Sequence, residues 1–111
     1  MTTDERAATP LVARRHHGVD VSVLVPAKDE ADNLIPFMEL AAEAFAADSG
    51  TRYEVVVIDD GSVDDSWEVL QRLQTQYPFL RAVRHRSKRG IADALRTGYL
   101  SSTGPVLVFY P

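Results

Sequence analysis

The stretch that decides the fold is Tyr53-Glu54-Val55-Val56-Val57-Ile58-Asp59-Asp60-Gly61-Ser62. Its first six residues form a nearly continuous apolar run rich in β-branched side chains, which is typical of a strand covered on both faces in a parallel sheet. Two carboxylates and a glycine end the run abruptly. The stretch therefore predicts a buried strand whose carboxyl end leads into a polar turn.

The same kind of apolar run recurs at regular spacing on both sides of this strand, at residues 21–25, 80–84 and 106–110. Helical spacing of apolar residues separates the runs, and it predicts helices over about 31–47, 67–77 and 91–98. Strands that alternate with helices across short connections imply right-handed crossovers and a parallel sheet. The predicted fold class is α/β, an open parallel sheet of alternating β-α units with helices on both faces.

Two helix starts can be predicted from local signals. Pro36 is tolerated only in the first turn of a helix, so regular helix should begin near Asn33. Ser62 is followed by Asp65 three residues later, a pattern that resembles a capping box, so Ser62 should cap the second helix.

Composition restricts the class of protein. The 111 residues suffice for one small domain, and 45% apolar with 25% charged residues is ordinary for a globular protein. No apolar run approaches the roughly 20 residues that cross a bilayer. The absence of cysteine fits a reducing compartment, so a cytoplasmic location is expected. Residues 1–19 lack any period and are predicted to be a flexible leader, in which the pair His16-His17, without a third ligand, is interpreted as incidental.

Ligands of open parallel sheets bind beyond the carboxyl ends of the strands. This rule selects residues 26–30, 59–62 and 85–90. Asp59 and Asp60 could accept hydrogen bonds from ribose hydroxyls or a base N–H, or they could only form the turn and cap a helix. Local chemistry does not choose between these two interpretations.

The other two segments are also ambiguous. Lys88 and Arg89 precede Gly90 and a helix start, which suits a phosphate site but also a solvated basic loop. A net charge of −4, and the lack of aromatic residues among the cations, argue against nucleic acid. Asp29 and Glu30 are interpreted as acids at a helix start. No glycine-rich dinucleotide turn or P-loop occurs in the sequence.

In their order and spacing, these segments resemble the first half of a family 2 glycosyltransferase with the GT-A fold. The resemblance covers about residues 20–111 and is carried by Val23-Leu24-Val25-Pro26-Ala27 with Asp29-Glu30, by Val57-Ile58-Asp59-Asp60-Gly61-Ser62 with Asp64, and by Arg89 through Gly98. The segment Gly90-Ile91-Ala92-Asp93-Ala94-Leu95-Arg96-Thr97-Gly98 is most similar to polyprenyl-phosphate sugar transferases of the dolichyl-phosphate mannose synthase type. Lys28 departs from the pattern, since many members carry an aromatic residue there, and Asp29 stands where Asn is common.

The resemblance implies a nucleotide-sugar donor, and an acceptor that in the most similar members is a polyprenyl phosphate. The donor-binding residues that it implies are Pro26, Ala27, Lys28, Glu30, Asp59, Asp60, Lys88, Arg89 and Gly90. It also implies a divalent metal, Mg²⁺ or Mn²⁺, held by an Asp-x-Asp motif that would follow residues 106–110. Because Pro111 is the last residue, no metal ligand and no catalytic residue is assigned here.

From the resemblance, residues 20–111 are expected to be the nucleotide-binding half of a glycosyltransferase domain, and the isolated chain is expected to be inactive. Contact with the cytoplasmic face of a membrane would then come from segments beyond Pro111. Two alternatives stay open. One is a non-catalytic module that binds a nucleotide or a protein, and the other makes Asp59 or Asp60 a phospho-acceptor, although Asp59-Asp60 lacks the Asp-x-Asp spacing of phosphatases.

Overall fold

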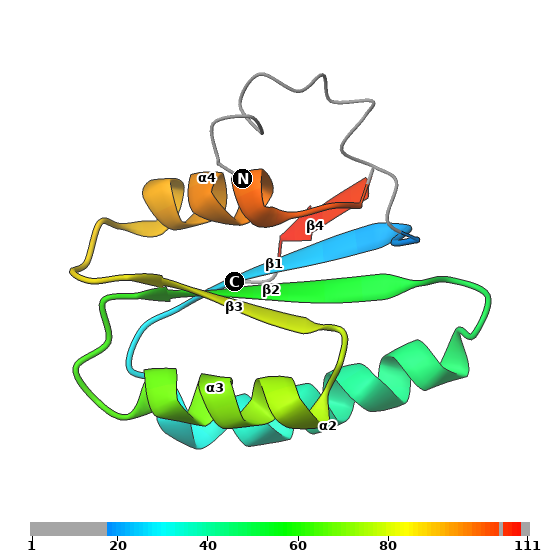
Figure 1. The fold of residues 1–111 in the computed structure, drawn as a ribbon, viewed down its shortest axis with the longest axis horizontal. Helices are drawn as coiled ribbons and strands as arrows, with labels where there is room; N and C mark the ends of the chain where they lie inside the picture. The colour runs from blue at the N-terminus through cyan, green and yellow to red at the C-terminus, as the bar shows by residue number, and fades with distance from the viewer. Residues whose placement is uncertain (1–17, 105, 110–111) are drawn as a thin grey trace.

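The computed structural model describes residues 18–104 and 106–109 of the chain. The predicted leader therefore lies, except for Gly18 and Val19, outside the described residues, as does the pair His16-His17. Strands and helices alternate along the described chain (Figure 1), in the order β1 (Val21–Ala27), α2 (Ala31–Ala47), β2 (Tyr53–Asp60), α3 (Ser66–Gln76), β3 (Leu80–His85), α4 (Ile91–Ser101) and β4 (Val106–Phe109).

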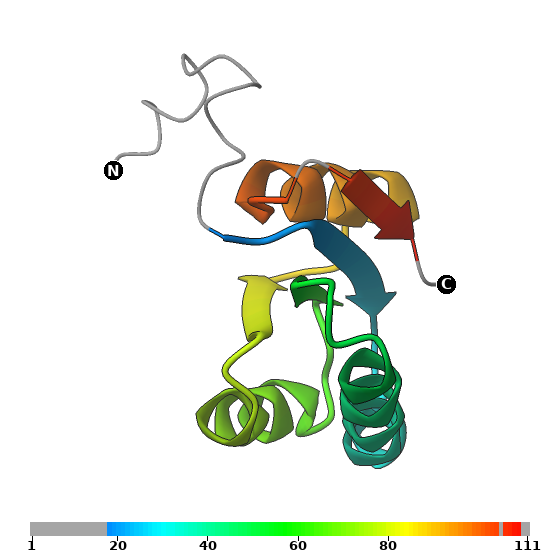
Figure 2. The same ribbon diagram turned by 90° about the vertical axis from the view of Figure 1, so that its right-hand side faces the viewer.

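The four strands form one parallel sheet in the order β3-β2-β1-β4. Helices α2 and α3 lie on one face of this sheet and α4 lies on the other, as both views show (Figures 1 and 2). The predicted α/β class, with its parallel sheet and helices on both faces, is confirmed. The strand order places β1 and β2 in the middle, with Ala27 beside Asp59 in the register, so the ends of these two strands adjoin each other.

Strand β2 is buried on both faces, which explains its continuous apolar sequence. Val55 and Val57 belong to the core under α2 and α3, together with side chains such as Met38 and Leu70. Val56 and Ile58 belong to a smaller core with Leu24 and Ala94 under α4. Burying a Val or Ile side chain contributes about 1.5–3 kcal/mol, so both cores hold β2 at the centre of the sheet.

Helix α4 approaches the sheet closely at Gly98. A Cβ on this glycine would lie 2.7 Å from Cδ1 of Ile58 and 3.4 Å from both Cδ atoms of Leu24. The first of these distances is shorter than van der Waals contact, so a side chain at this position would have to displace the end of the Ile58 side chain. The close approach brings the amino end of α4 to the carboxyl ends of β2 and β3.

The predicted range 31–47 matches α2, but the start inferred from Pro36 and the cap inferred from Ser62 were both wrong. Helix α2 begins at Ala31, two residues before Asn33, so Pro36 lies in its second turn, where a proline has no N–H to donate to the carbonyl of Asp32. Helix α3 begins at Ser66, and Asp65 rather than Ser62 occupies its N-cap position, without a capping side-chain hydrogen bond. Ser62 has a different partner, in the loop after β1.

Candidate functional site

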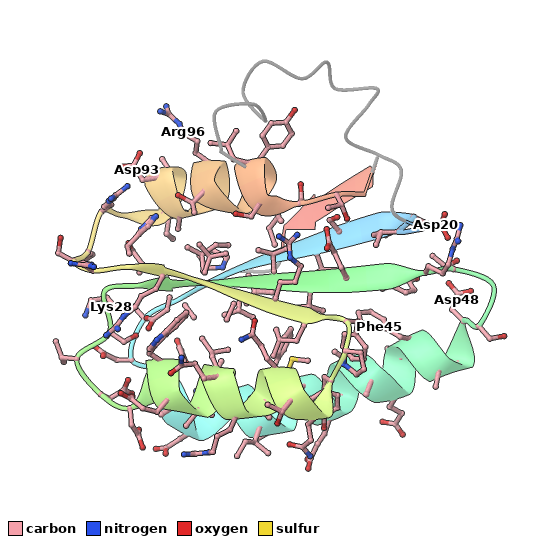
Figure 3. All side chains as sticks on the ribbon, in the orientation of Figure 1. Asp20, Lys28, Phe45, Asp48, Asp93 and Arg96 are labelled. Atoms are coloured by element: carbon pink, nitrogen blue, oxygen red, sulfur yellow. The ribbon has the colours of Figure 1, made fainter. Side chains whose placement is uncertain are left out.

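The carboxyl ends of β1, β2 and β3 bring the three predicted loops to one edge of the sheet. Figure 3 shows Lys28 and Asp93 at this edge, whereas Asp20 and Asp48 lie at the opposite one. A cavity of about 340 Å³ opens there, which is within the range of small-molecule sites. Its lining residues are Pro26, Ala27, Lys28, Glu30, Asp60, Lys88, Gly90 and Ile91.

The structure thus gathers most of the predicted site residues around one space. Of the nine, only Asp59 and Arg89 are not among the lining residues of this cavity. Ile91, which the sequence analysis did not single out, is part of the lining and is 67% exposed. An exposed isoleucine at the first position of a helix gives no local sequence signal, because a core-facing isoleucine would look the same.

A second, smaller cavity of about 150 Å³ shares Pro26, Ala27 and Glu30 with the first. It continues along the first turns of α2, where Asn33, Leu34 and Phe37 line it. The shared residues make the loop after β1 a common wall of both cavities. The lining of the larger cavity includes the charged side chains of Lys28, Glu30, Asp60 and Lys88, whereas Glu30 is the one charged residue in the lining of the smaller cavity.

Asp59 lies directly behind this wall. Its side chain is completely buried, and it is the register partner of Ala27. Oδ1 accepts a hydrogen bond from the backbone N–H of Ser62 at 3.1 Å. Oδ2 is buried and has no hydrogen-bond partner among the described residues. Buried carboxylate oxygens are almost always paired, so Oδ2 has capacity for a further hydrogen bond, although Asp59 lines neither cavity.

Asp60 is buried as well, but its hydrogen bonds go to the loop after β3. Oδ1 accepts the backbone N–H of Arg89 at 2.9 Å and lies 2.8 Å from Nδ1 of His85, and Oδ2 accepts the N–H of Gly90 at 2.9 Å. Burial raises the pKa of Asp60, but these three hydrogen bonds outweigh it and hold the pKa below its usual value. Asp60 therefore fixes the loop that carries the predicted phosphate-binding cations.

Gly61 allows the loop after β3 to approach the turn after β2. Its φ is 77°, and a Cβ there would lie only 2.4 Å from the backbone N of Lys88. No side chain can occupy that space, and few residues other than glycine adopt this backbone conformation. The turn after β2 and the loop after β3 are consequently in direct backbone contact.

The loops after β1 and β2 are tied together by reciprocal hydrogen bonds. Asp29, with a φ of 55°, donates its N–H to Oγ of Ser62 at 2.8 Å, and its Oδ1 accepts the N–H groups of Val63 and Asp64 at 2.8 and 3.2 Å. The ammonium of Lys28, 2.8 Å from Oδ2, and these backbone donors lower the pKa of Asp29. The expected helix-start acid thus joins two loops instead of capping its own helix.

Side chains that follow β2 also accept hydrogen bonds from the backbone N–H groups at the amino end of α2. The N–H of Glu30 donates to Oγ of Ser66 at 3.0 Å, and the N–H of Ala31 donates to Oδ2 of Asp64 at 3.3 Å. These partners are more than 30 residues away in the sequence. A search for local caps could not have found them.

The basic run between Arg81 and Arg89 divides into parts with different roles. Arg81 lies near Glu54 at the other end of the sheet, and the guanidinium of Arg84 stacks over Trp67 at 5.3 Å. Lys88 and Arg89 are exposed, and within the described chain neither forms an ion pair. Their charges are available to an anion at the cavity, whereas the charge of a paired or stacked cation is not.

Two further properties concern only residues 18–104 and 106–109. No three His, Cys, Asp or Glu side chains converge there to hold a metal ion. The described residues therefore do not fit a metal centre by themselves. None of the described helices is long and apolar enough to cross a membrane.

The chain has relatives among known proteins. A dolichol-phosphate mannosyltransferase of Pyrococcus furiosus is 36% identical over 88 residues, which cover 79% of this chain and 24% of that protein. An undecaprenyl-phosphate 4-deoxy-4-formamido-L-arabinose transferase of Pseudomonas syringae is 32% identical over 90 residues, covering 79% of this chain and 26% of that protein. The chain thus spans about a quarter of the length of each.

Two solved structures have a similar fold. The mannosyltransferase PcManGT of Pyrobaculum calidifontis, in complex with GDP-Man and Mn²⁺, superimposes with a TM-score of 0.67 at 26% identity, over 94% of this chain and 31% of that one. TarS of S. aureus has a TM-score of 0.65 at 21% identity, over 83% of this chain and 27% of that one, which supports the fold alone. The predicted GT-A fold is confirmed. The sequence pattern described as "Glycosyl transferase family 2" matches residues 22–110, and the chain belongs to this family.

Proposed function

We propose that this chain forms the nucleotide-binding part of a glycosyltransferase that transfers a sugar from a nucleotide-sugar donor to an acceptor, with polyprenyl phosphate as the acceptor class. The observation that carries the proposal is the buried Oδ2 of Asp59, which has no partner among the described residues, behind a cavity whose lining includes Lys88, a cation without an ion pair in the described chain. Nucleoside N–H or O–H groups and an anionic diphosphate are the two kinds of partner that such a site lacks.

Each residue has a distinct part in this proposal. Pro26 and Ala27 offer an apolar wall to the nucleoside, while Asp59 and Asp60 accept hydrogen bonds from a base N–H or from ribose hydroxyls. Lys88, Arg89 and the N–H groups at the start of α4 attract the diphosphate. Lys28 and Glu30, on the loop after β1, border the same space.

Transfer breaks the bond between the anomeric carbon and the diphosphate oxygen, and it forms a bond from that carbon to an acceptor oxygen. A phosphate acceptor is already anionic at neutral pH and needs little help from a general base. PcManGT was solved with Mn²⁺, and we extend the requirement for a divalent ion to this protein by similarity. Such an ion supplies charge neutralisation on the leaving diphosphate.

A transfer assay tests the proposal in the protein at its natural full length. Labelled mannose or glucose would be followed from GDP-mannose or UDP-glucose to a polyprenyl phosphate. Asp59→Asn changes one buried oxygen to an amide nitrogen, and we expect at least a tenfold loss of nucleotide affinity, about the effect of one charged hydrogen bond. Asp48→Asn, at the opposite edge of the sheet, is the matched control and should leave affinity unchanged.

The outcomes separate this function from the alternatives. Tight binding of GDP or UDP without transfer to any acceptor would favour the non-catalytic module. Absence of nucleotide binding, or equal binding by Asp59→Asn and Asp48→Asn, would contradict the proposed role of Asp59.

A further inference from the structure

His85 is the last residue of β3, and both nitrogens of its buried ring are engaged. The side chain is 3% exposed. Nδ1 lies 2.8 Å from Oδ1 of Asp60, and Nε2 lies 2.7 Å from Oγ1 of Thr97 on α4. The ring thus connects a residue that lines the cavity to the helix that begins at the cavity edge.

The hydrogen-bonding capacity of the partners fixes the arrangement of protons. The carboxylate of Asp60 only accepts, so Nδ1 carries a hydrogen and donates it. Nε2 can accept the hydroxyl hydrogen of Thr97, or it can donate to that oxygen when the ring is protonated, because a threonine hydroxyl does both. The contact between His85 and Asp60 is therefore compatible with either charge state of the ring.

The carboxylate of Asp60 is nearly saturated. It offers about four acceptor positions. His85 and the N–H of Arg89 use Oδ1, and the N–H of Gly90 uses Oδ2. One position on Oδ2 is left, on a side chain that lines the larger cavity. The direction of this position depends on the rotation of the carboxylate, which the hydrogen bond from His85 restrains.

We propose that His85 is a positioning residue for donor binding. Held by Thr97, it orients the carboxylate of Asp60, which in turn holds the Arg89–Gly90 backbone at the cavity and presents its remaining acceptor to the nucleotide. The identity of the ligand rests on the proposed function, whereas the restraint of the loop does not. A histidine that merely filled the core would stabilise the whole domain without affecting this loop or its ligand in particular.

Amide hydrogen exchange and nucleotide affinity, measured in the protein at its natural full length, test the proposal. His85→Leu keeps an apolar side chain of similar size but removes both hydrogen bonds. We expect exchange at the amides of Arg89 and Gly90 to accelerate by at least about tenfold. The Val69 amide, which donates to the Asp65 carbonyl in α3, serves as an internal reference and should be unchanged. Affinity for GDP or UDP, whichever binds more tightly to the parent protein, should fall about tenfold.

Three further variants make the test specific. His85→Asn can place an amide N–H near the position of Nδ1, so it should restore most of the affinity and most of the protection. Thr97→Val preserves the shape of the side chain but removes the partner of Nε2, and it should loosen the same two amides to a smaller degree. Thr97→Ser keeps the hydroxyl and is the control. If His85→Leu fails to fold, the pair at Thr97 still decides the question.

Unchanged exchange at Arg89 and Gly90 in His85→Leu or, if that variant fails to fold, in Thr97→Val would overturn the proposal. So would faster exchange with unchanged nucleotide affinity, because the loop would then be restrained for another reason. If the parent protein bound neither GDP nor UDP, the proposed function and the donor role of His85 would both fall. The exchange data would still show, independently, whether His85 holds the loop.

Discussion

Strand β2 carries buried carboxylates at both ends, and Glu54 at the amino end is used differently from Asp59 at the carboxyl end. At the amino end, Oε2 of Glu54 accepts hydrogen bonds from the Ser22 hydroxyl at 2.6 Å and from the N–H and hydroxyl of Thr103 at 2.6 and 3.1 Å. Oε1 lies 3.4 Å from the guanidinium of Arg81, which also donates to the carbonyl of Ser101. At the carboxyl end, Oδ2 of Asp59 has no partner in the described chain.

This difference separates a carboxylate that holds the fold together from one that we propose accepts a hydrogen bond from a ligand. Glu54 joins β1, β3 and the end of α4, and every group around it belongs to the chain. Burial raises the pKa of Glu54, but the hydrogen bonds and the charge of Arg81 outweigh it, so the pKa lies below its usual value. The comparison predicts that changes at the amino end act on stability and changes at the carboxyl end act on binding.

The largest effect is expected for Glu54→Ala. The substitution leaves the Ser22 hydroxyl, the Thr103 N–H and the Arg81 guanidinium without their shared partner, so the free energy of unfolding should fall by about 2–4 kcal/mol. Urea unfolding measures it, with exposed Glu43→Ala as the control. A loss below about 1 kcal/mol would show that the network at the amino end contributes little.

Gly61→Ala should have the next largest effect, and it should reduce both stability and nucleotide binding. The new Cβ would meet the backbone of Lys88, and the φ of 77° is unfavourable for alanine, so we expect a loss of about 1–3 kcal/mol together with weaker nucleotide binding. Gly50→Ala is the matched control, because a Cβ there meets nothing within 4 Å. Equal melting temperatures for the two variants would argue against the close contact of the loops.

Lowering the pH should reduce the stability that Glu54 contributes at the amino end of β2 and that Asp60 contributes at its carboxyl end. The pKa values of Glu54 and Asp60 are lowered from the ordinary values of 4.5 and 3.8. A carboxyl with a depressed pKa in the folded state contributes stability above its unfolded pKa, and that contribution is lost as the pH falls through the folded value. Unfolding free energy should therefore decrease below about pH 4.5, with a shallower slope in Glu54→Gln. A slope equal to that of the parent protein would exclude Glu54 as a major source of the pH dependence of stability.

The smallest effect on stability is expected for Lys88→Ala. Lys88 is exposed and forms no ion pair within the described chain, so the unfolding free energy should change by less than about 0.5 kcal/mol. Nucleotide affinity should nevertheless fall several-fold at low salt, and the difference from the parent should shrink as salt is added. Arg96→Ala, whose side chain points away from the sheet in Figure 3, is the control for charge. Equal affinities in the two variants would remove Lys88 from the site.

Sequence periodicity predicted the layers of the fold because each element has to bury a face of defined spacing. The four apolar runs and three helical stripes correspond to the observed strands and helices, and the rule on strand ends led to the edge of the sheet where the larger cavity lies. The assignment of nucleotide contacts to individual residues at this edge stays a prediction.

Long-range hydrogen bonds were beyond sequence reasoning. Ser62 looked like a helix cap, but Asp29, 33 residues earlier, provides its partner. Asp60 looked like either a ligand contact or a residue that forms the turn and caps a helix, yet it accepts hydrogen bonds from backbone groups 29 and 30 residues later. No individual role was predicted for Glu54 or His85, since a polar residue in a strand shows its role only when the neighbouring elements are in place.

The mutual fastening of the three loops has a consequence for protein engineering. The loop after β3 depends on Asp60 and Gly61 for its position, and the loop after β1 depends on Ser62, Asp64 and Ser66. A loop exchanged singly with a relative, in order to change donor preference, would arrive without the groups that shape it. The transferable unit is the set of all three loops with residues 59–66, because this segment is the one that both of the others contact.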